Sequence, residues 1–266
     1  MPYRRTFVLL RGLVREHRHW GTFPETLQAC LPDDEIILFD FPGNGLRNKE
    51  NSATTIVDMV ADVRSFSLSH SKNQPVHIIA LSLGAMVAVE WINEYPEECA
   101  GAVLISSSLR GLSPFYQRLL PANYLAIFKS LVLPEDIHQK ESRILDLVSN
   151  IATKDTIKRV AILNQWVDYA KQNPVSAANG LRQLIAAMRF RVPAQRPDVP
   201  ILLLNSLADH MVSPECSETL ARHWQLPLDT HDTAGHDIPL DDAEWVCERI
   251  VQWLLTLRNQ VNSDAK

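Results

Sequence analysis

The chain has 266 residues, of which 46% are hydrophobic and 21% are charged, and its formal net charge is −5. This length and apolar content suit one globular domain with a sizeable core, and the negative charge argues against a general nucleic-acid-binding protein. No apolar run approaches the roughly 20 residues that span a bilayer, so we expect no membrane span. The four cysteines are widely separated, with no CxxC pair. Such spacing favours free thiols in a reducing compartment, and hence the cytoplasm, over a disulfide framework or a zinc site.

Short apolar runs alternate with helical periodicity in the first part of the chain. The predicted strands cover residues 7–10, 35–39, 76–80 and 101–105, and the predicted helices cover residues 54–69 and 82–94. The first run is interrupted at once by Arg11 and has no small-residue cleavage site after it, which favours a strand over a signal peptide. Strands that alternate with helices predict a mostly parallel sheet covered by helices on both faces.

The middle of the chain follows a different pattern. Residues 109–191 show no convincing strand alternation, and their helical stretches are broken by Pro114, Pro121, Pro134 and Pro174. The alternation resumes with predicted strands at 201–205 and 228–230 and predicted helices at 214–223 and 243–257, and the end, 259–266, is expected to fray. We therefore predict an α/β core made of residues 1–108 and 192–266. Residues 109–191 would be an inserted helical lid over the carboxyl ends of the strands, where sites in open α/β sheets lie.

The serine that ends the third predicted strand is the first candidate for chemistry. Ser82 lies between Ala80 and Gly84, at the point where a strand pattern changes directly into a helix pattern. This is the small-x-Ser-x-Gly nucleophile elbow, in which small neighbours tolerate a strained turn that exposes the hydroxyl. The backbone N–H of Leu83 would then face a developing negative charge from a helix N-terminus. Taken alone, the pentapeptide also fits a serine that caps an ordinary helix.

A serine hydroxyl needs a base to take its proton and an acid to orient that base. Asp209 lies just past the fifth predicted strand, and His236 lies just past the sixth, after a glycine, Gly235, that would let the loop turn sharply. Each residue alone also fits a solvated loop position. Their chain order, Ser82, Asp209, His236, is the order described for α/β-hydrolases.

Two loops extend this pattern. Residues 9–13 resemble an oxyanion loop, in which a strand runs into His-Gly and an apolar residue, and residues 39–45 resemble an Asp-x-Pro-Gly-x-Gly turn. On these motifs the chain resembles the α/β-hydrolase superfamily, in its lid-bearing serine hydrolase and carboxylesterase group, over nearly its whole length. It departs from the family pattern at Ala80, Asn44 and Arg11, where glycine, histidine and histidine are usual.

The resemblance implies the α/β-hydrolase fold and a set of roles. Ser82 would be the nucleophile, His236 the base and Asp209 the orienting acid, and the backbone N–H groups of Leu83 and Leu13 would form the oxyanion hole. No metal and no organic cofactor is expected. The serine argues against haloalkane dehalogenases and epoxide hydrolases, which resemble this fold but use aspartate at the elbow.

A basic cluster follows the first predicted strand and comprises Arg11, Arg15, His17, Arg18 and His19. Arg11 would either fix the oxyanion loop through its own hydrogen bonds or project a cation toward the substrate. The cluster as a whole fits either a solvated loop or a positive rim that attracts an anionic or carrier-bound acyl group. The two histidines alone do not predict a metal site, because no ligand-spaced Cys, Asp or Glu accompanies them.

The predicted lid supplies six aromatic candidates for substrate binding, namely Phe115, Tyr116, Tyr124, Phe128, Trp166 and Tyr169. They would either line an apolar acyl pocket or form the core of the lid itself. The predicted function is hydrolysis of a carboxylic ester or thioester of a small or medium acyl substrate. The alternatives are a carbon–carbon bond hydrolase, an amidase or a lyase with the same triad, or a non-catalytic binding protein of this fold.

Overall fold

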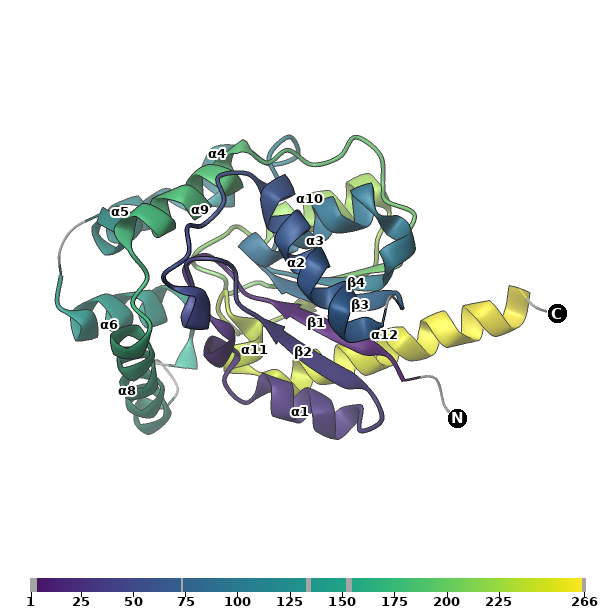
Figure 1. Ribbon diagram of the computed structural model, residues 1–266, viewed down its shortest axis with the longest axis horizontal. Helices are drawn as coiled ribbons and strands as arrows, with labels where there is room; N and C mark the ends of the chain where they lie inside the picture. Colours follow the sequence, from purple (N-terminus) through teal and green to yellow (C-terminus); the bar gives the residue numbers. More distant parts are fainter. Residues whose placement is uncertain (1–3, 73, 133–134, 152–154, 265–266) are drawn as a thin grey trace.

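A computed structural model describes residues 4–72, 74–132, 135–151 and 155–264. Within these residues a six-stranded sheet has the order β2-β1-β3-β4-β5-β6, and all neighbouring strands are parallel (Figure 1). The strands are β1 (Thr6–Leu10), β2 (Glu35–Phe39), β3 (Val76–Leu81), β4 (Cys99–Ile105), β5 (Ile201–Ser206) and β6 (Leu228–His231). The strands predicted from the sequence are therefore present, with ends that differ by two residues or fewer.

The register of the strands brings their carboxyl ends to one edge of the sheet. Leu10 of β1 pairs with Ala80 of β3, and Leu81 pairs with Ile105 of β4. All residues of β1 and β3 are buried, as expected for strands covered on both faces. The loops that follow these strands therefore start side by side.

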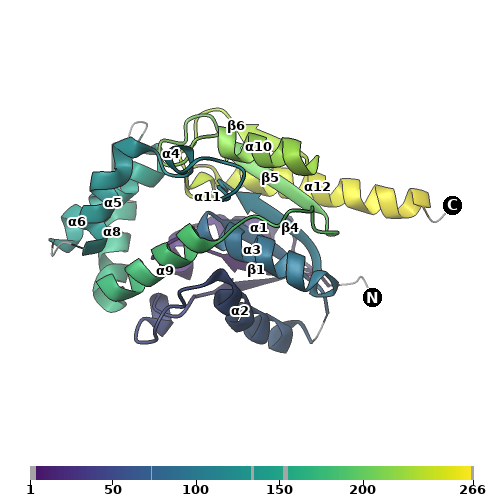
Figure 2. The ribbon, with the colours of Figure 1, turned by 90° about the horizontal axis from the view of Figure 1, so that it is seen from above.

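Two layers of helices cover the sheet. One layer comprises α1 (Phe23–Cys30), α11 (Ile238–Asp241) and α12 (Ala243–Asp264), and the other comprises α2 (Ile56–Ser71), α3 (Leu83–Glu94) and α10 (Glu215–Trp224) (Figures 1 and 2). Alternate residues of β1 point into the two cores, with Val8 on the side of α2 and α3 and Leu9 on the side of α1 and α12. Helix α1 is absent from the sequence prediction, because only Phe23 and Leu27 of it are buried and its apolar pattern is short.

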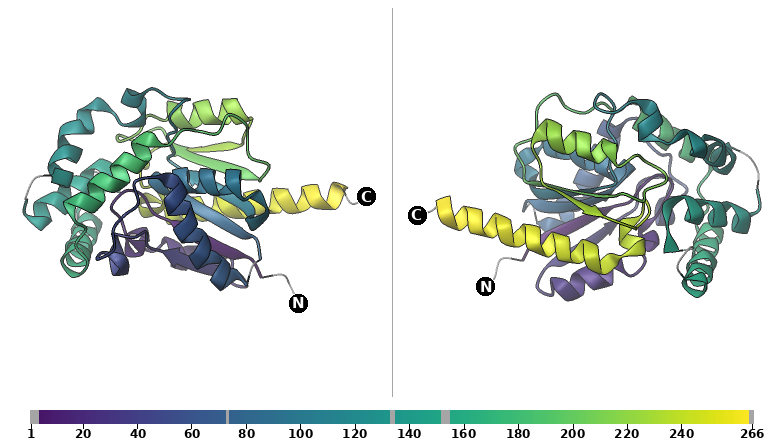
Figure 3. Two further views of the ribbon diagram at one scale, coloured as in Figure 1. Left: turned by 45° about the horizontal axis from the view of Figure 1, so that its top comes forward. Right: turned by 180° about the vertical axis from the view of Figure 1, so that it is seen from behind.

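The stretch between β4 and β5 is helical, as its lack of strand pattern predicts. We call its elements the middle helices; they are α4 (Phe115–Arg118), η4 (Pro121–Asn123), α5 (Tyr124–Val132), α6 (Ile137–Val148), α8 (Thr156–Gln172) and α9 (Ala177–Arg189). They extend beyond one end of the sheet in every view (Figures 1–3). A third apolar cluster joins Leu145 of α6 and Trp166 of α8 to Leu240 of α11. The break predicted at Pro134 lies outside the described residues.

Short 3-10 helices complete the fold at η1 (His17–Trp20), η2 (Gly45–Arg47) and η3 (Pro96–Glu98). The prediction that the chain frays from Asn259 is wrong for residues 259–264, because α12 continues to Asp264 and projects past the sheet (Figure 3). Each residue added to an existing helix gains a hydrogen bond, so a helix can continue without packing. In the part of the chain that the structure covers, no helix has both the length and the apolar character needed to cross a bilayer.

Candidate active site

Ser82 occupies the turn between β3 and α3 in a backbone conformation that residues other than glycine rarely adopt. Its φ is 55° and its ψ is −110°. Such backbone strain costs of order 1–3 kcal/mol and persists only where the surrounding structure enforces it. The side chain lines a cavity at the carboxyl edge of the sheet. This strand–turn–helix geometry is that of a nucleophile elbow.

The chain around the turn is packed so closely that small residues are required. A Cβ on Gly84 would lie 2.4 Å from the carbonyl oxygen of Leu10, closer than real contacts allow. A Cβ on Gly12 would lie 3.4 Å from the Cβ of Ser82. The loop after β1 therefore lies directly against the elbow. Ala80, which stands where glycine is usual, is accommodated as a fully buried residue of β3.

Asp209 and His236 come from the loops after β5 and β6, and their side chains are in direct contact. The Nδ1–H of His236 donates to Oδ2 of Asp209 at 2.8 Å, and both side chains are 4% exposed. The other carboxylate oxygen accepts hydrogen bonds from the backbone N–H groups of Met211 at 2.8 Å and Val212 at 2.9 Å. Three hydrogen bonds thus fix the carboxylate, and the carboxylate fixes the imidazole. This arrangement leaves Nε2 as the nitrogen available for proton transfer.

Nε2 of His236 is buried and has no hydrogen-bond partner among the described residues. Ser82 lines the same cavity, although no hydrogen bond joins its hydroxyl to this nitrogen in the described structure. Burial alone lowers the pKa of His236, but the charge and hydrogen bond of Asp209, together with the charge of Asp237, outweigh it and raise the pKa above the usual value. A higher pKa makes the neutral imidazole a stronger base.

The loop that carries His236 is packed against the end of α6. The N–H of Asp237 donates to the carbonyl of Val148 at 2.7 Å, and a Cβ on Gly235 would lie 2.6 Å from the same oxygen. Gly235 is not among the residues with positive φ. Close approach to α6 therefore requires a glycine at this position, a reason that the sequence analysis did not give.

The two candidate oxyanion donors lie on either side of Ser82 in the fold. Leu83 is the first residue of α3, so its N–H is one of the amides that have no acceptor within the helix and carry the positive end of the helix dipole. Leu13 follows the glycine that contacts Ser82, and it lines the cavity. The oxyanion hole itself stays a prediction.

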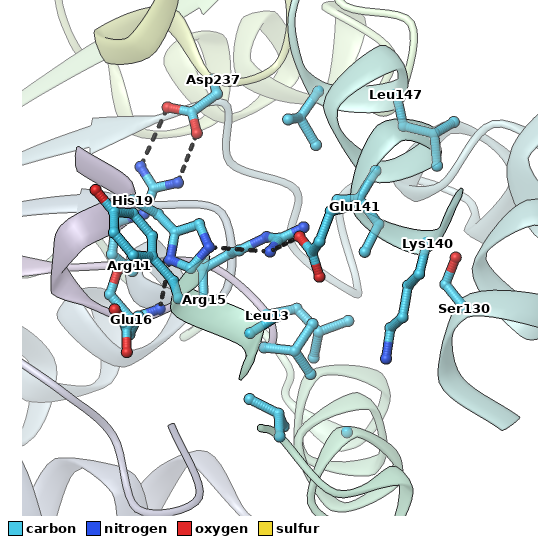
Figure 4. Close-up of a pocket in the computed structure, with 18 of the residues that line it drawn as sticks. Arg11, Leu13, Arg15, Glu16, His19, Ser130, Lys140, Glu141, Leu147 and Asp237 are labelled. Carbon is cyan, nitrogen blue, oxygen red and sulfur yellow. Dashed lines mark hydrogen bonds and ion pairs between the residues drawn. The ribbon is translucent and has the colours of Figure 1, made fainter. Parts of the chain in front are cut away.

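The cavity has a volume of about 190 Å³ and lies between the loops after β1 and β6 and the middle helices. Its apolar lining includes Leu13, Ile127, Ile144, Leu147, Val148 and Met211. Charged side chains form another part of the wall, where Arg15, Glu141 and Lys140 lie close to one another (Figure 4). The site is thus an apolar chamber with a charged wall, a form that suits an organic molecule with a polar group.

Arg11 binds the residue that follows His236. Its Nη1 and Nη2 donate to the two carboxylate oxygens of Asp237 at 3.1 and 2.5 Å, and both side chains are 2% exposed (Figure 4). The guanidinium also stacks over Trp20, 4.7 Å from the ring centroid. Arg11 was expected either to fix the loop after β1 through hydrogen bonds or to project a cation toward the substrate. The structure shows the first arrangement, because both ends of the guanidinium bind Asp237. The sequence reasoning did not single out Asp237.

The other members of the basic cluster have partners nearby, so the attraction of an anionic or carrier-bound acyl group by this cluster stays a prediction. The other members all contact acidic or basic partners: Arg15 binds Glu141 at 2.7 Å and His19 at 3.0 Å, His17 binds Asp40 at 2.8 Å, and Arg18 binds Glu16. Burial, followed by the charges of Arg15 and Arg11, holds the pKa of His19 well below its usual value. Carboxylates thus neutralise the arginines, Glu16 from the same loop and Glu141 and Asp237 from other elements, and His19 is uncharged at neutral pH.

Five of the six aromatic candidates, all except Tyr169, are not among the described residues that line the cavity. Phe115, Tyr116, Tyr124 and Phe128 are exposed, whereas Trp166 is buried between α6 and α8. The Trp166 ring lies beneath the guanidinium of Arg15, 4.5 Å away. The sixth candidate, Tyr169 of α8, does line the cavity, together with aliphatic side chains.

Asn44, for which no role was predicted, holds the loop after β1 through hydrogen bonds. Its amide donates to the carbonyl of Arg15 at 3.0 Å and accepts from Nε2 of Gln183 at 2.8 Å. Oε1 of Gln183 in turn accepts from the N–H of Val14 at 2.8 Å. The loop after β1 is therefore fastened to α9. A buried glutamine on an amphipathic helix is the signal that could have indicated this contact.

Metal binding has no evident donor set. Among the described residues, no group of three or more His, Cys, Asp or Glu side chains could hold a metal ion. The four cysteines are free thiols, with Cys30 exposed and the others buried.

Comparisons with known proteins match the fold and the family. Residues 7–249 match the Alpha/beta hydrolase family. A Mycobacterium tuberculosis protein named "Putative non-heme bromoperoxidase BpoC" is 25% identical over 242 residues, which cover 86% of this chain and 85% of that protein. Its crystal structure has a TM-score of 0.75 at 19% identity and covers 96% of this chain and 93% of that one.

Two other solved structures share the fold. A hydrolase from Pseudomonas aeruginosa PA01 has a TM-score of 0.77 at 17% identity, covering 96% of this chain and 91% of its own. A thermophilic esterase from Thermogutta terrifontis has a TM-score of 0.71 at 19% identity, covering 95% and 90%. The fold class expected from the sequence is confirmed. Because the family match extends over most of its length, the chain belongs to the alpha/beta hydrolase family.

Proposed function

We propose that this protein is a serine hydrolase that cleaves a carboxylic ester or thioester of a small organic substrate through an acyl-enzyme. One observation carries the proposal. The contact between Asp209 and His236 leaves an unpartnered Nε2 on the cavity that Ser82 lines from a strained elbow. A nucleophile, a base and an orienting acid within one cavity are the components of acyl transfer.

In the first step His236 takes the proton of Ser82 as the hydroxyl oxygen attacks the carbonyl carbon. The resulting imidazolium is stabilised by Asp209, and the backbone N–H groups of Leu83 and Leu13 hold the oxyanion. Loss of one such donor typically costs about 10²- to 10³-fold in rate. The imidazolium then gives its proton to the leaving alcohol or thiol, and the acyl group stays on Ser82.

In the second step His236 takes a proton from water, and the water oxygen attacks the acyl-enzyme. Collapse of the second tetrahedral species returns the proton to Ser82 and releases the acid. The same three side chains serve both steps. The apolar lining of the cavity strengthens each of these electrostatic interactions by lowering the local dielectric constant.

Fluorophosphonate labelling tests the proposal. The probe should modify native protein at Ser82, identified by peptide mass spectrometry, and p-nitrophenyl esters of graded chain length should be hydrolysed. Ser82→Ala should abolish both, whereas Ser69→Ala, at an exposed serine of α2, should change neither. A folded protein that is not labelled at Ser82 would favour the non-catalytic binding protein.

The nature of the cleaved bond calls for a panel of substrates. Esters, thioesters, amides and vinylogous diketones of matched size separate the ester hydrolase from the amidase and the carbon–carbon hydrolase. The relative named as a bromoperoxidase adds a second candidate, which is oxidation of bromide with hydrogen peroxide. If the protein brominates an organic acceptor and Ser82→Ala does not, the peroxidase activity is supported. If Ser82→Ala brominates equally well, the bromination does not arise at this site.

A further inference from the structure

One cation on the cavity wall has no counter-ion. Within the part of the chain that the structure describes, the other lysine, arginine and carboxylate side chains that line the cavity are all paired, in the ion pairs Arg11–Asp237, Arg15–Glu141 and Glu16–Arg18. Lys140 lines the same cavity and forms no such pair. Figure 4 shows its side chain extending along the cavity near Glu141 and Ser130.

Lys140 is partly buried on α6. Burial lowers its pKa; the charges of Glu141 and Glu135 oppose this effect and the charge of Arg15 adds to it. Burial of a cation without a close partner is unfavourable, and a bound anion would offset the cost. An acidic ligand next to Lys140 would therefore offset the cost of its partial burial.

A second donor on the same wall is also unused. Arg15 is about nine-tenths buried, and although its Nη1 binds Glu141 and His19, its Nη2 has no hydrogen-bond partner among the described residues. The hydroxyl of Ser130 is not a further donor, because it already donates to the carbonyl of Ala126. The charged wall thus carries one ammonium without a counter-ion and, on Arg15, one buried guanidinium nitrogen without a hydrogen-bond partner.

We propose that Lys140 and Arg15 bind a carboxylate on the substrate, so that the preferred substrates are esters whose apolar chain ends in an acid. The inference rests on the proposed function. Val148, at the other end of α6, contacts the N–H of Asp237 beside the catalytic histidine. It follows Lys140 by eight residues, about 12 Å along the helix axis at 1.5 Å per residue. Between them Ile144 and Leu147 line the cavity, which suits an apolar spacer of that length.

Matched substrates test the inference on the acyl side. p-Nitrophenyl hydrogen suberate and p-nitrophenyl octanoate differ only in a terminal carboxylate against a methyl group. The protein should prefer the suberate. Lys140→Met should lower kcat/KM for the suberate by about tenfold or more through KM, as expected for loss of a charge-assisted contact, and should leave the octanoate unchanged or improved.

Two further variants and a second substrate pair complete the design. Lys140→Arg should retain the preference, and Lys171→Met, at an exposed lysine of α8, should not alter it. The second pair is 6-acetoxyhexanoate and hexyl acetate, in which the terminal acid, where present, lies on the alcohol part of the ester. If the wild-type protein prefers the acidic member of one pair and Lys140→Met abolishes that preference, the acid binds on the corresponding side of the ester. If Lys140→Met changes the preference in neither pair, the inference is overturned.

Calorimetric titration separates this inference from the proposed function. Suberate should bind the wild-type protein at least about tenfold more tightly than Lys140→Met, whereas the uncharged 1-octanol should bind both alike. Suberate binding that depends on Lys140 in a protein without esterase activity would retain the site and overturn the proposed function. Esterase activity together with equal suberate binding in both proteins would overturn the site alone.

Discussion

Arg11 and Asp237, which are 226 residues apart in the chain, form a buried two-point ion pair that joins the loop after β1 to the residue that follows His236. The pair connects the segment that carries a candidate oxyanion donor with the segment that carries the proposed base, His236. The negative charge of Asp237 also contributes to the raised pKa of His236. One interaction thereby supports both the geometry and the electrostatics of the site.

Removal of one partner of this pair should be strongly destabilising. Arg11→Met leaves the Asp237 carboxylate buried without a counter-ion, which typically costs about 3–5 kcal/mol of the free energy of unfolding. The double variant Arg11→Met/Asp237→Leu should be more stable than the single variant, because no unpaired charge remains. Urea denaturation of both variants measures the difference.

An exposed ion pair provides the control for this experiment. Arg222 and Glu218 lie 3.8 Å apart on α10, with the Arg222 side chain 70% exposed. Arg222→Ala should cost at most about 1 kcal/mol. If Arg11→Met costs no more than Arg222→Ala, the buried pair contributes little to the fold.

The pH dependence of activity should follow the protonation of His236. The base must be neutral, so kcat/KM should rise with pH through an apparent pKa above 6.5. Asp209→Asn removes two effects that raise this pKa and leaves burial, which lowers it. The acid limb should therefore move to lower pH, while kcat falls by about 10⁴-fold. An NMR titration of the imidazole gives the same pKa independently of turnover.

The same pKa shift has a consequence for stability. A pKa raised in the folded protein stabilises the fold fully below the unfolded value of about 6.5, and this contribution is lost as the pH rises through the folded pKa. Asp209→Asn should reverse that dependence. His17→Asn, which removes a histidine paired with Asp40 outside the cavity lining, should leave the acid limb of activity in place. An acid limb that stays fixed in Asp209→Asn would contradict the assignment of His236.

The sequence contains enough information to predict the three central residues. Ser82, Asp209 and His236 each follow an apolar run that ends within a few residues, and parallel strands bring such ends to one edge of the sheet. The strand boundaries are predictable because strands buried on both faces are nearly continuous apolar runs. The order of serine, aspartate and histidine along the chain, which is the order described for α/β-hydrolases, then distinguishes these residues from other polar residues at strand ends.

The walls of the cavity are not predictable in the same way. The apolar periodicity of α6 indicates that one face is buried, but it does not say that Glu141 meets Arg15, 126 residues earlier in the chain. Nor does the sequence show that carboxylates from four separate segments neutralise the basic cluster. Such contacts depend on how the middle helices pack, and no local pattern in the sequence encodes that packing.

Gly84→Ala should destabilise the protein, against the usual effect of this substitution in a helix. Alanine is normally favoured over glycine inside helices by about 1 kcal/mol. Here the new Cβ would lie 2.4 Å from the carbonyl oxygen of Leu10, and overpacking against backbone typically costs about 1–3 kcal/mol. Differential scanning calorimetry should show a lower Tm, and fluorophosphonate labelling should slow because the elbow shifts.

Gly12→Ala is the matched comparison, since its Cβ would make an ordinary contact, 3.4 Å from the Cβ of Ser82. It should change Tm much less than Gly84→Ala. A Tm for Gly84→Ala at or above the wild-type value would show that β1 and α3 can move apart at this point. That result would contradict the close packing described at the elbow.

The strained backbone at Ser82 should lower the free energy of unfolding by a measurable amount. With φ at 55°, glycine is the residue that adopts this conformation at least cost, so Ser82→Gly should be more stable than Ser82→Ala by about 1–2 kcal/mol. Neither variant retains the nucleophile, so the comparison isolates the backbone. At Ser69, in the helix α2, the order should reverse, and alanine should be the more stable by about 1 kcal/mol. Urea denaturation of the four variants tests both signs, and equal stability of the two Ser82 variants would mean that the turn stores no strain.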